Sequence, residues 1–266
     1  MAASAFGLDP TPLTIEQLSV AYGEHRAVER LSFTVRSGEI YGLIGSNGAG
    51  KSSTIKAVVG LVRPSEGRVR VFGFDAVTDG LRAKERLGYV PETSLLYEAL
   101  TPREFLEFIA SVRRLDRNVA SERARSYATA FRLEGEFEEP IASLSNGTRQ
   151  KVLIIAALLH QPPLLVLDEP LNSLDPRSVR IMKELLMRYV ASTGRGVLFS
   201  THTMEVAQQL CHRVGILDRG VLRAEGTLGG LRERAAAGDA TLEEVFLRLT
   251  REDEGLDAAV RALQGA

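Results

Sequence analysis

The stretch that most constrains this chain runs from residue 41 to residue 55. Within it Gly45, Gly50, Lys51 and Ser52 fit the phosphate-loop pattern, in which Gly is followed after four residues by Gly, Lys and Ser or Thr. Glycines let the backbone bend so that successive N–H groups point into one concavity, and a helix N-terminus adds partial positive charge there. The pattern favours a cradle for nucleotide phosphates over a Gly-rich turn that binds nothing.

The surroundings of the loop support this interpretation. An apolar run over residues 40–44 precedes it, and a helix-compatible segment over 52–61 follows it. Strand, loop and helix in this order are the context that the pattern requires. Lys51 would place its charge on the β- and γ-phosphates, and the Ser52 hydroxyl is a hard oxygen ligand suited to Mg²⁺. The nucleotide-binding residues expected from this loop are Gly45, Ser46, Asn47, Gly48, Ala49, Gly50, Lys51, Ser52 and Ser53.

Composition narrows the class of protein. The 266 residues suffice for one large domain or two small ones with a substantial core. The formal net charge is −1, so there is no basic excess to neutralise a nucleic-acid backbone, and no nucleic-acid partner is expected. The single cysteine, Cys211, excludes an intrachain disulfide and fits a reducing compartment. We expect it to pack in the core on a helix.

The sequence also bears on location. The longest apolar run, residues 152–159, is far shorter than the roughly 20 residues that cross a bilayer. Residues 1–12 lack a basic start and an apolar core, so they do not resemble a signal peptide and are expected to form a flexible leader. We therefore expect a cytoplasmic protein that reaches the membrane through a partner.

Hydrophobic periodicity outlines an α/β chain. Alternating segments at 13–22, 28–35 and 67–73 predict strands, and the absence of intervening helices between the first two favours antiparallel pairing. Thr101, Pro102 and Glu104 predict a capping box that opens a mainly helical section over about 97–159. Short apolar runs at 164–167 and 197–201 are typical of buried parallel strands.

Three of the predicted strands end at polar residues suited to chemistry. The first leads to Gly45, the second to Asp168 and Glu169, and the third to His202. Because ligands bind beyond the carboxyl ends of parallel strands, these groups should meet at one edge of the sheet. Asp168 is placed to hold Mg²⁺, Glu169 to orient and deprotonate a water, and His202 to donate a hydrogen bond to the γ-phosphate and that water.

Residues 144–150 complete a family resemblance. This stretch is similar to the signature sequence of the ABC transporters. Taken with the phosphate loop, Asp168 and His202, it makes the chain resemble the nucleotide-binding subunit of an ABC transporter over about residues 13–228. The resemblance implies ATP as ligand and a dimer in which the helix start at 144–148 faces the γ-phosphate held by a second protomer. The residues given this contact are Leu144, Ser145, Asn146, Gly147 and Thr148.

The resemblance assigns further roles. Ser173, Leu174 and Asp175 fall in the loop that crosses the dimer between the two sites, and Tyr22 matches the aromatic residue that stacks on adenine. Glu92 stands where the family often has Gln, and we expect it to join Ser52 and Asp168 at the metal. This substitution adds charge beside the phosphates.

Two further departures lie in the signature. Asn146 replaces Gly and is expected to preserve the turn because Asn tolerates positive φ, and Thr148 replaces Gln. Since Lys51, Asp168, Glu169 and His202 are all present, the site is expected to hydrolyse ATP.

We expect a RecA-like P-loop NTPase core with an antiparallel β-subdomain and an inserted α-helical subdomain over residues 13–228, followed by a C-terminal helical extension over 229–266. The predicted function is the ATPase subunit of an ABC transporter. It would pair with a second copy or a homologous ATPase, and drive a separate transmembrane permease from the cytoplasmic face of the membrane. Residues 89–100 and 241–249 resemble members of the family that power exporters of drugs, lipids or polysaccharides, so export is favoured over import. The alternatives are a soluble ABC ATPase acting on ribosomes or DNA, and a regulatory subunit that binds ATP without hydrolysis.

Overall fold

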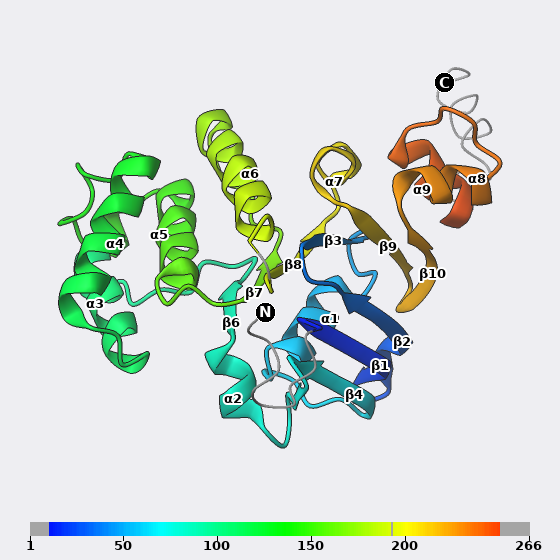
Figure 1. Cartoon of the computed structure of the whole chain (residues 1–266), viewed down its shortest axis with the longest axis horizontal. Helices are drawn as coiled ribbons and strands as arrows, with labels where there is room; N and C mark the ends of the chain where they lie inside the picture. Colours follow the sequence, from blue (N-terminus) through cyan, green and yellow to red (C-terminus); the bar gives the residue numbers. More distant parts are fainter. Residues whose placement is uncertain (1–10, 193, 251–266) are drawn as a thin grey trace, which may run out of the picture.

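A computed structural model describes residues 11–192 and 194–250, which contain two β-sheets with helices between and beside them (Figure 1). The smaller sheet has four strands in the order β2-β1-β4-β5, and every neighbouring pair is antiparallel. This confirms the antiparallel pairing that the alternating segments predicted. Its strands are β1 (Leu13–Tyr22), β2 (His25–Val35), β4 (Glu66–Val71) and β5 (Phe74–Asp75).

The larger sheet has six strands in the order β10-β9-β3-β8-β7-β6. All neighbours from β9 to β6 are parallel, and β10 runs antiparallel to β9. Both apolar runs that predicted buried parallel strands lie at its centre. Its strands are β3 (Glu39–Ile44), β6 (Leu87–Val90), β7 (Leu164–Asp168), β8 (Gly196–Thr201), β9 (Arg213–Asp218) and β10 (Val221–Gly226).

The parallel sheet is buried on both faces. Along β7, Leu165 and Leu167 pack into the core shared with the helical section, whereas Leu164 and Val166 pack into the core shared with the antiparallel sheet. This division follows from the period of two along a strand. Burial on both faces explains why these strands are continuous apolar runs.

Helices lie between and beside the sheets. Helix α1 follows the phosphate loop, α3 to α5 form the inserted section, α6 and α7 connect successive strands, and α8 and α9 close the described chain. Their bounds are α1 Lys51–Val58, α2 Gly80–Glu85, α3 Pro102–Val112, α4 Arg117–Phe131, α5 Asn146–Leu158, α6 Pro176–Val190, α7 Met204–Leu210, α8 Leu228–Arg234 and α9 Leu242–Thr250.

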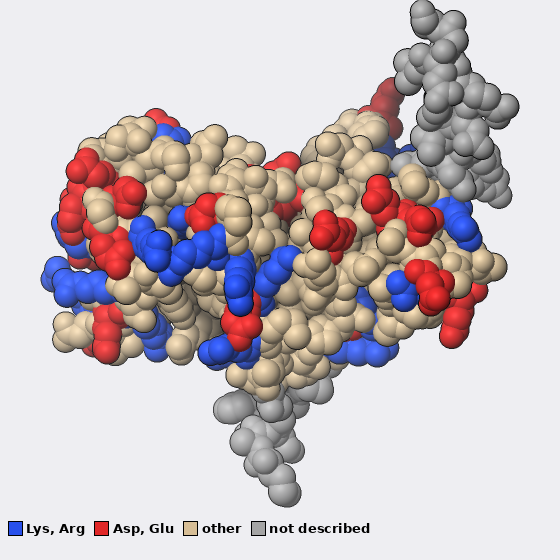
Figure 2. All heavy atoms as spheres, turned by 90° about the horizontal axis from the view of Figure 1, so that it is seen from above, with Lys and Arg blue, Asp and Glu red and all other residues tan. Residues whose placement is uncertain are grey.

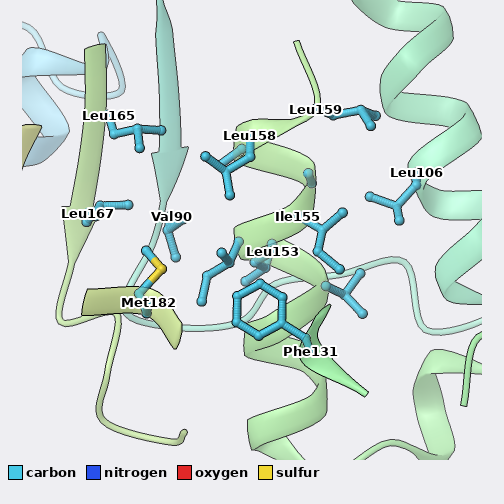
Figure 3. Close-up of a cluster of buried hydrophobic side chains, with 14 of the residues drawn as sticks. Val90, Leu106, Phe131, Leu153, Ile155, Leu158, Leu159, Leu165, Leu167 and Met182 are labelled. Carbon is cyan, nitrogen blue, oxygen red and sulfur yellow. The ribbon is translucent and has the colours of Figure 1, made fainter. Parts of the chain in front are cut away.

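The helical section has its own apolar centre, which continues onto the parallel sheet. Figure 3 shows Leu106 of α3 and Phe131 of α4 in one cluster with Leu153, Ile155 and Leu158 of α5. The capping box opens α3 as predicted: the Glu104 N–H donates to Thr101 Oγ1 at 3.2 Å, and the Thr101 N–H donates to Glu104 Oε2 at 2.9 Å. The observed architecture confirms the predicted α/β fold with its antiparallel and helical subdomains.

Some local predictions need correction. Helix α1 ends at Val58 rather than at residue 61, because Gly60 takes a left-handed φ of 69° and its N–H bonds back to Ala57. Cys211 directly follows α7 instead of lying within it, and its thiol packs over Gly42. Burial raises the pKa of this thiol to about 12. It therefore contributes packing, as expected, but from the end of the helix.

The two ends of the chain fall partly outside the description. Residues 1–10 of the predicted leader and residues 251–266 of the predicted extension lie outside the described residues. Helices α8 and α9, which precede residue 251, pack with α7 and β9 around Leu231 and Phe246. None of the helices in the described ranges is both long and apolar enough to cross a membrane.

Charge is distributed in both signs over the face shown in Figure 2. Lys and Arg gather over the region of α5 and α6, and Asp and Glu lie on either side of them. This mixture accords with the net charge of −1.

Candidate active site

The site lies at the carboxyl edge of the parallel sheet. Ile44 pairs in register with Thr201, and Asp168 pairs with Ser200, so β3, β7 and β8 end side by side. The phosphate loop, the two carboxylates and His202 each follow one of these strand ends. The structure therefore places at one edge the three groups that the sequence expected to meet there.

The phosphate loop passes too close to its neighbours to carry side chains at two of its glycines. Gly50, the N-cap of α1, has φ 105°, and a Cβ there would lie 2.5 Å from the Ala27 carbonyl oxygen. A Cβ on Gly45 would overlap the Leu217 carbonyl. The loop is thus held tightly between β2 and β9, with the N–H groups of α1 opening onto the site.

Lys51 is folded back into this loop. Its Nζ donates to the carbonyl oxygens of Gly45 at 2.8 Å and Ser46 at 3.1 Å, and the side chain is only 6% exposed. The same ammonium lies 3.7 Å from Glu169 Oε1. A buried cation so close to a concavity of backbone N–H groups favours an anionic ligand.

Asp168 is oriented from the neighbouring strand. The Ser200 hydroxyl donates to Asp168 Oδ1 at 2.6 Å and accepts the Glu169 N–H at 3.1 Å. Burial raises the pKa of Asp168, while hydrogen bonds from Ser200 and Ser52 act in the opposite direction. The sequence alone did not single out Ser200, because its role depends on the pairing of β7 with β8, which lie about thirty residues apart in the chain. Its position two residues before His202, at the end of a predicted strand, was the only sign of this role.

Glu169 leaves the strand in an unusual backbone conformation. Its φ is 47°, a left-handed value that is uncommon for a residue with a side chain, so its direction is set by this turn rather than by strand alternation alone. Oε1 lies 3.0 Å from His202 Nδ1. Oε2 is buried and has no hydrogen-bond partner among the described residues. A buried carboxylate with one free oxygen is suited to accept a proton from a bound water.

His202 faces this carboxylate from the end of β8. Its side chain is 45% exposed, so one edge of the ring contacts Glu169 and the remainder faces outward. The ring is therefore placed to orient the Glu169 carboxylate.

Ser52, Glu92 and Asp168 bring together oxygen atoms that could hold a metal ion. The Ser52 hydroxyl lies 3.5 Å from Glu92 Oε2 and is hydrogen-bonded to Asp168. Among residues 11–192 and 194–250, no group of three or more His, Cys, Asp or Glu side chains could hold a metal ion. A hydroxyl and two carboxylates nevertheless suit Mg²⁺, which normally keeps waters and takes phosphate oxygens as further ligands.

A hollow of about 330 Å³ opens in front of Lys51, Ser52, Glu92 and Glu169, whereas Asp168 and His202 are not part of its lining. Tyr22, 45% exposed at the end of β1, lies at this hollow with an accessible ring. Gly45, Ser46 and Ala49 belong to the loop but not to the lining, and His25 and Ala27 line it without having been predicted. The lining comprises Tyr22, His25, Ala27, Asn47, Gly48, Gly50, Lys51, Ser52, Ser53, Glu92 and Glu169.

The signature segment forms the start of α5. Ser145 is the N-cap: its Oγ accepts the Thr148 N–H at 3.2 Å and lies 2.9 Å from Thr148 Oγ1. Asn146 is the first helical residue, so the expected tolerance of positive φ is not what this position requires. A Cβ on Gly147 would lie 2.5 Å from the Ser173 carbonyl oxygen. These residues lie apart from the lining of the hollow, with Leu144 buried in the helical core.

The segment after Glu169 leads into α6. Asp175 is the N-cap of α6 and accepts the Ser178 N–H at 2.9 Å, and Lys151 Nζ of α5 lies 2.8 Å from Asp175 Oδ2. These bonds, with that of Lys151 the largest, hold the pKa of Asp175 well below its usual range. Ser173 contacts Gly147, and Leu174 packs against the helical core. This segment is therefore joined to the signature helix in the same chain.

A phosphate loop, a buried lysine and paired carboxylates at the carboxyl edge of a parallel sheet define a P-loop nucleoside triphosphatase. Residues 28–172 match the family model described as ABC transporter. The chain belongs to this family, as one of its ATP-binding subunits.

Relatives extend the similarity over most of the chain. The chain is 37% identical to the ABC-type transporter ATP-binding protein EcsA of Bacillus subtilis over 91% of its own length and 98% of that protein. It is 35% identical to the linearmycin resistance ATP-binding protein LnrL of the same organism, over 94% of this chain and 79% of that one. A solved ATP-binding subunit of an ABC transporter superposes with TM-score 0.86 at 35% identity, covering 90% of this chain and all of that one.

Proposed function

We propose that this chain hydrolyses ATP to drive a separate membrane permease. The observation that supports hydrolysis best is the arrangement of Glu169: one carboxylate oxygen contacts His202, and the other is buried without a partner among the described residues. A regulatory subunit that only binds ATP does not need a buried base in this position. The phosphate loop, by contrast, would serve both functions.

ATP would enter the hollow with adenine against the Tyr22 ring and its phosphates on the loop. Phosphate oxygens would then compete with the Gly45 and Ser46 carbonyls for the Lys51 ammonium. As Lys51 turns to the phosphates, its 3.7 Å ion pair with Glu169 weakens, and the carboxylate becomes free to accept a proton. Binding of the substrate thereby prepares the base.

Hydrolysis breaks the bond between the β–γ bridging oxygen and the γ-phosphorus while a water oxygen bonds to that phosphorus. Glu169 takes the proton of this water at Oε2, and His202 keeps Oε1 in place and donates a hydrogen bond towards the transferring group. Ser52, Asp168 and Glu92 would hold Mg²⁺, which neutralises charge on the β- and γ-phosphates. Ser200 keeps Asp168 in the required orientation.

A complete site is proposed to need two ATPase chains. Ser145 is exposed at the start of α5, yet residues 144–148 lie apart from the hollow of their own chain. A helix N-terminus is a suitable partner for phosphate. In the proposed dimer each chain applies this segment to the ATP held by the other, and Ser173, Leu174 and Asp175 lie between the two sites.

The permease is proposed to contact the region after β6. Leu95 and Tyr97 are exposed there, and Tyr97 stacks edge-on against the half-exposed Phe108 of α3. Such an apolar group at the junction between core and helical section is suited to a partner segment. This contact would place the chain on the cytoplasmic face of the membrane.

Export is the proposed direction of transport. The chain is similar to a linearmycin resistance protein and is 36% identical, over 80% of its length and 62% of that protein, to the Nod factor export ATP-binding protein I of Sinorhizobium fredii. The second of these names states export, and the first states resistance to linearmycin, which export from the cell would provide.

Replacing Glu169, the proposed base, tests this function. Glu169→Gln should bind ATP, lose steady-state phosphate release and elute as a dimer from gel filtration with ATP and Mg²⁺. Glu184→Gln on the exposed face of α6 is the control, since Glu184 pairs with Arg188 and does not line the hollow; it should hydrolyse ATP like the parent. A Glu169→Gln chain that stays monomeric in ATP, or that hydrolyses it at the parental rate, contradicts the proposal.

A further inference from the structure

Gln150 is a buried amide with both ends hydrogen-bonded. It lies in the second turn of α5 and is 3% exposed. Its Oε1 accepts the Ser94 hydroxyl at 2.9 Å, and its Nε2 donates to the Pro170 carbonyl oxygen at 3.4 Å. A buried amide is costly unless it is bonded, and an apolar side chain of similar volume would fill the same space. The amide therefore serves to orient its two hydrogen-bond partners rather than to fill space.

The two partners of Gln150 belong to the two loops that carry the proposed chemistry. Ser94 follows Glu92 by two residues in the loop after β6, and Pro170 directly follows Glu169 in the loop after β7. The side chain of Gln150 thus connects the loop that carries the candidate metal ligand, the loop that carries the candidate base and the helix that begins with the signature. It lies outside the lining of the nucleotide hollow.

Two other contacts already join α5 to the loop after β7. Gly147 lies against the Ser173 carbonyl, and Lys151 pairs with Asp175. Through these contacts the start of α5 must follow that loop. Gln150 adds the loop after β6, which also carries the exposed Leu95 and Tyr97. Among these three α5 residues, only Gln150 bonds to both loops.

We propose that Gln150 is a positioning residue that couples both catalytic loops to the signature segment. When the loops around Glu92 and Glu169 rearrange on nucleotide, the amide moves the start of α5 with them, and so prepares it for the second chain. The inference rests on the proposed function, because it assumes that residues 144–148 contact ATP across a dimer.

The test measures dimerisation apart from nucleotide binding. In the Glu169→Gln background, Gln150→Leu should raise the ATP concentration for half-maximal dimer by about fivefold or more, since each protomer loses two buried hydrogen bonds. The affinity of the monomer for a fluorescent ATP analogue should stay within about twofold, because Gln150 does not line the hollow. Ser94→Ala should act in the same direction with a smaller effect, and adding it to Gln150→Leu should change nothing further, because the two share one bond.

Gln209→Leu on the exposed face of α7 is the matched control and should dimerise like its parent. Gln150→Met is the second variant should Gln150→Leu fail to fold. Dimerisation of the Gln150 variants at the parental ATP concentration overturns the inference, as does an equal loss of monomer affinity.

A second readout does not require dimers. Hydrogen exchange of the amides at 146–150 should slow on addition of ATP in the parent and respond less in Gln150→Leu. Equal responses overturn the coupling. If Glu169→Gln alone remains monomeric while this difference is seen, the dimeric function fails and the coupling within the chain stands.

Discussion

Gly147 offers the sharpest test of the contact between the signature helix and the segment after Glu169. A methyl group at Gly147 would lie 2.5 Å from the Ser173 carbonyl oxygen, whereas carbon–oxygen contacts prefer about 3.3 Å or more. Gly147→Ala must therefore separate the helix start from that loop by about 0.8 Å, the difference between these two distances. The backbone fixes the position of the methyl carbon, and the Ser173 carbonyl is itself backbone, so no side-chain rotation relieves the overlap.

The chain provides a matched control at Gly229. Gly147 is the second residue of α5 after the N-cap Ser145, and Gly229 is the second residue of α8 after the N-cap Thr227. A Cβ on Gly229 meets no atom within 4 Å. The gain of about 0.5–1 kcal/mol from replacing Gly by Ala in a helix applies to both variants and cancels in the comparison.

The expected difference between the two variants is the cost of the overlap. Urea unfolding should show Gly147→Ala to be less stable than Gly229→Ala by about 1–3 kcal/mol, the range for inserted methyl groups in packed sites. Steady-state ATPase should fall by about tenfold to a hundredfold in Gly147→Ala, because misplacement approaching 1 Å has such an effect on a reacting assembly. Gly229→Ala should retain parental activity. Equal stability and equal ATPase in the two variants would refute the reasoning.

Three further outcomes are expected. Lys51→Ala should weaken ATP binding by about tenfold to a hundredfold in a fluorescent-nucleotide titration, because the charged donor to phosphate is lost; unchanged affinity would contradict its role. Burial first, and then Arg113, lowers the pKa of His160 from 6.5 to about 4, so its contribution to stability is complete above pH 6.5 and is lost as pH falls towards 4. His160→Gln should flatten the dependence of unfolding free energy on pH in this window, and a parallel curve would count against it. Thr101→Ala should cost about 1 kcal/mol in urea unfolding through loss of the α3 cap, whereas Thr129→Ala on the exposed face of α4 should cost nothing; equal effects would rule out the cap.

The strands and the longer helices follow from local pattern. The period of two predicts β1 with the bounds 13–22 that the structure shows, and the capping signals locate the start of α3. In contrast, β5 and α2 have two and six residues, too few for a periodic signal, and both depend on packing beside β4 and β6. Short elements of this kind are formed by tertiary contacts rather than by propensity.

The residues of the candidate site also divide into those that the sequence pattern predicts and those that only the folded structure reveals. Gly45, Lys51, Asp168 and Glu169 carry signals in the chain itself, namely a spaced motif and polar residues after apolar runs. Their assigned roles stay predictions until the variants are measured. The partners that orient them have no such signal, because Ser200 reaches Asp168 across 32 residues and Ser94 reaches Gln150 across 56.

The packing of Cys211 over Gly42 has a practical consequence for labelling chemistry. It is the only cysteine of the chain, and burial raises the pKa of its thiol to about 12, so very little reactive thiolate is present at neutral pH. Maleimide should therefore modify a cysteine introduced at an exposed site far faster than the native one. A fluorophore or a cross-linker on a cysteine introduced at an exposed position near residues 144–148 would report on the approach of a second chain without first replacing Cys211.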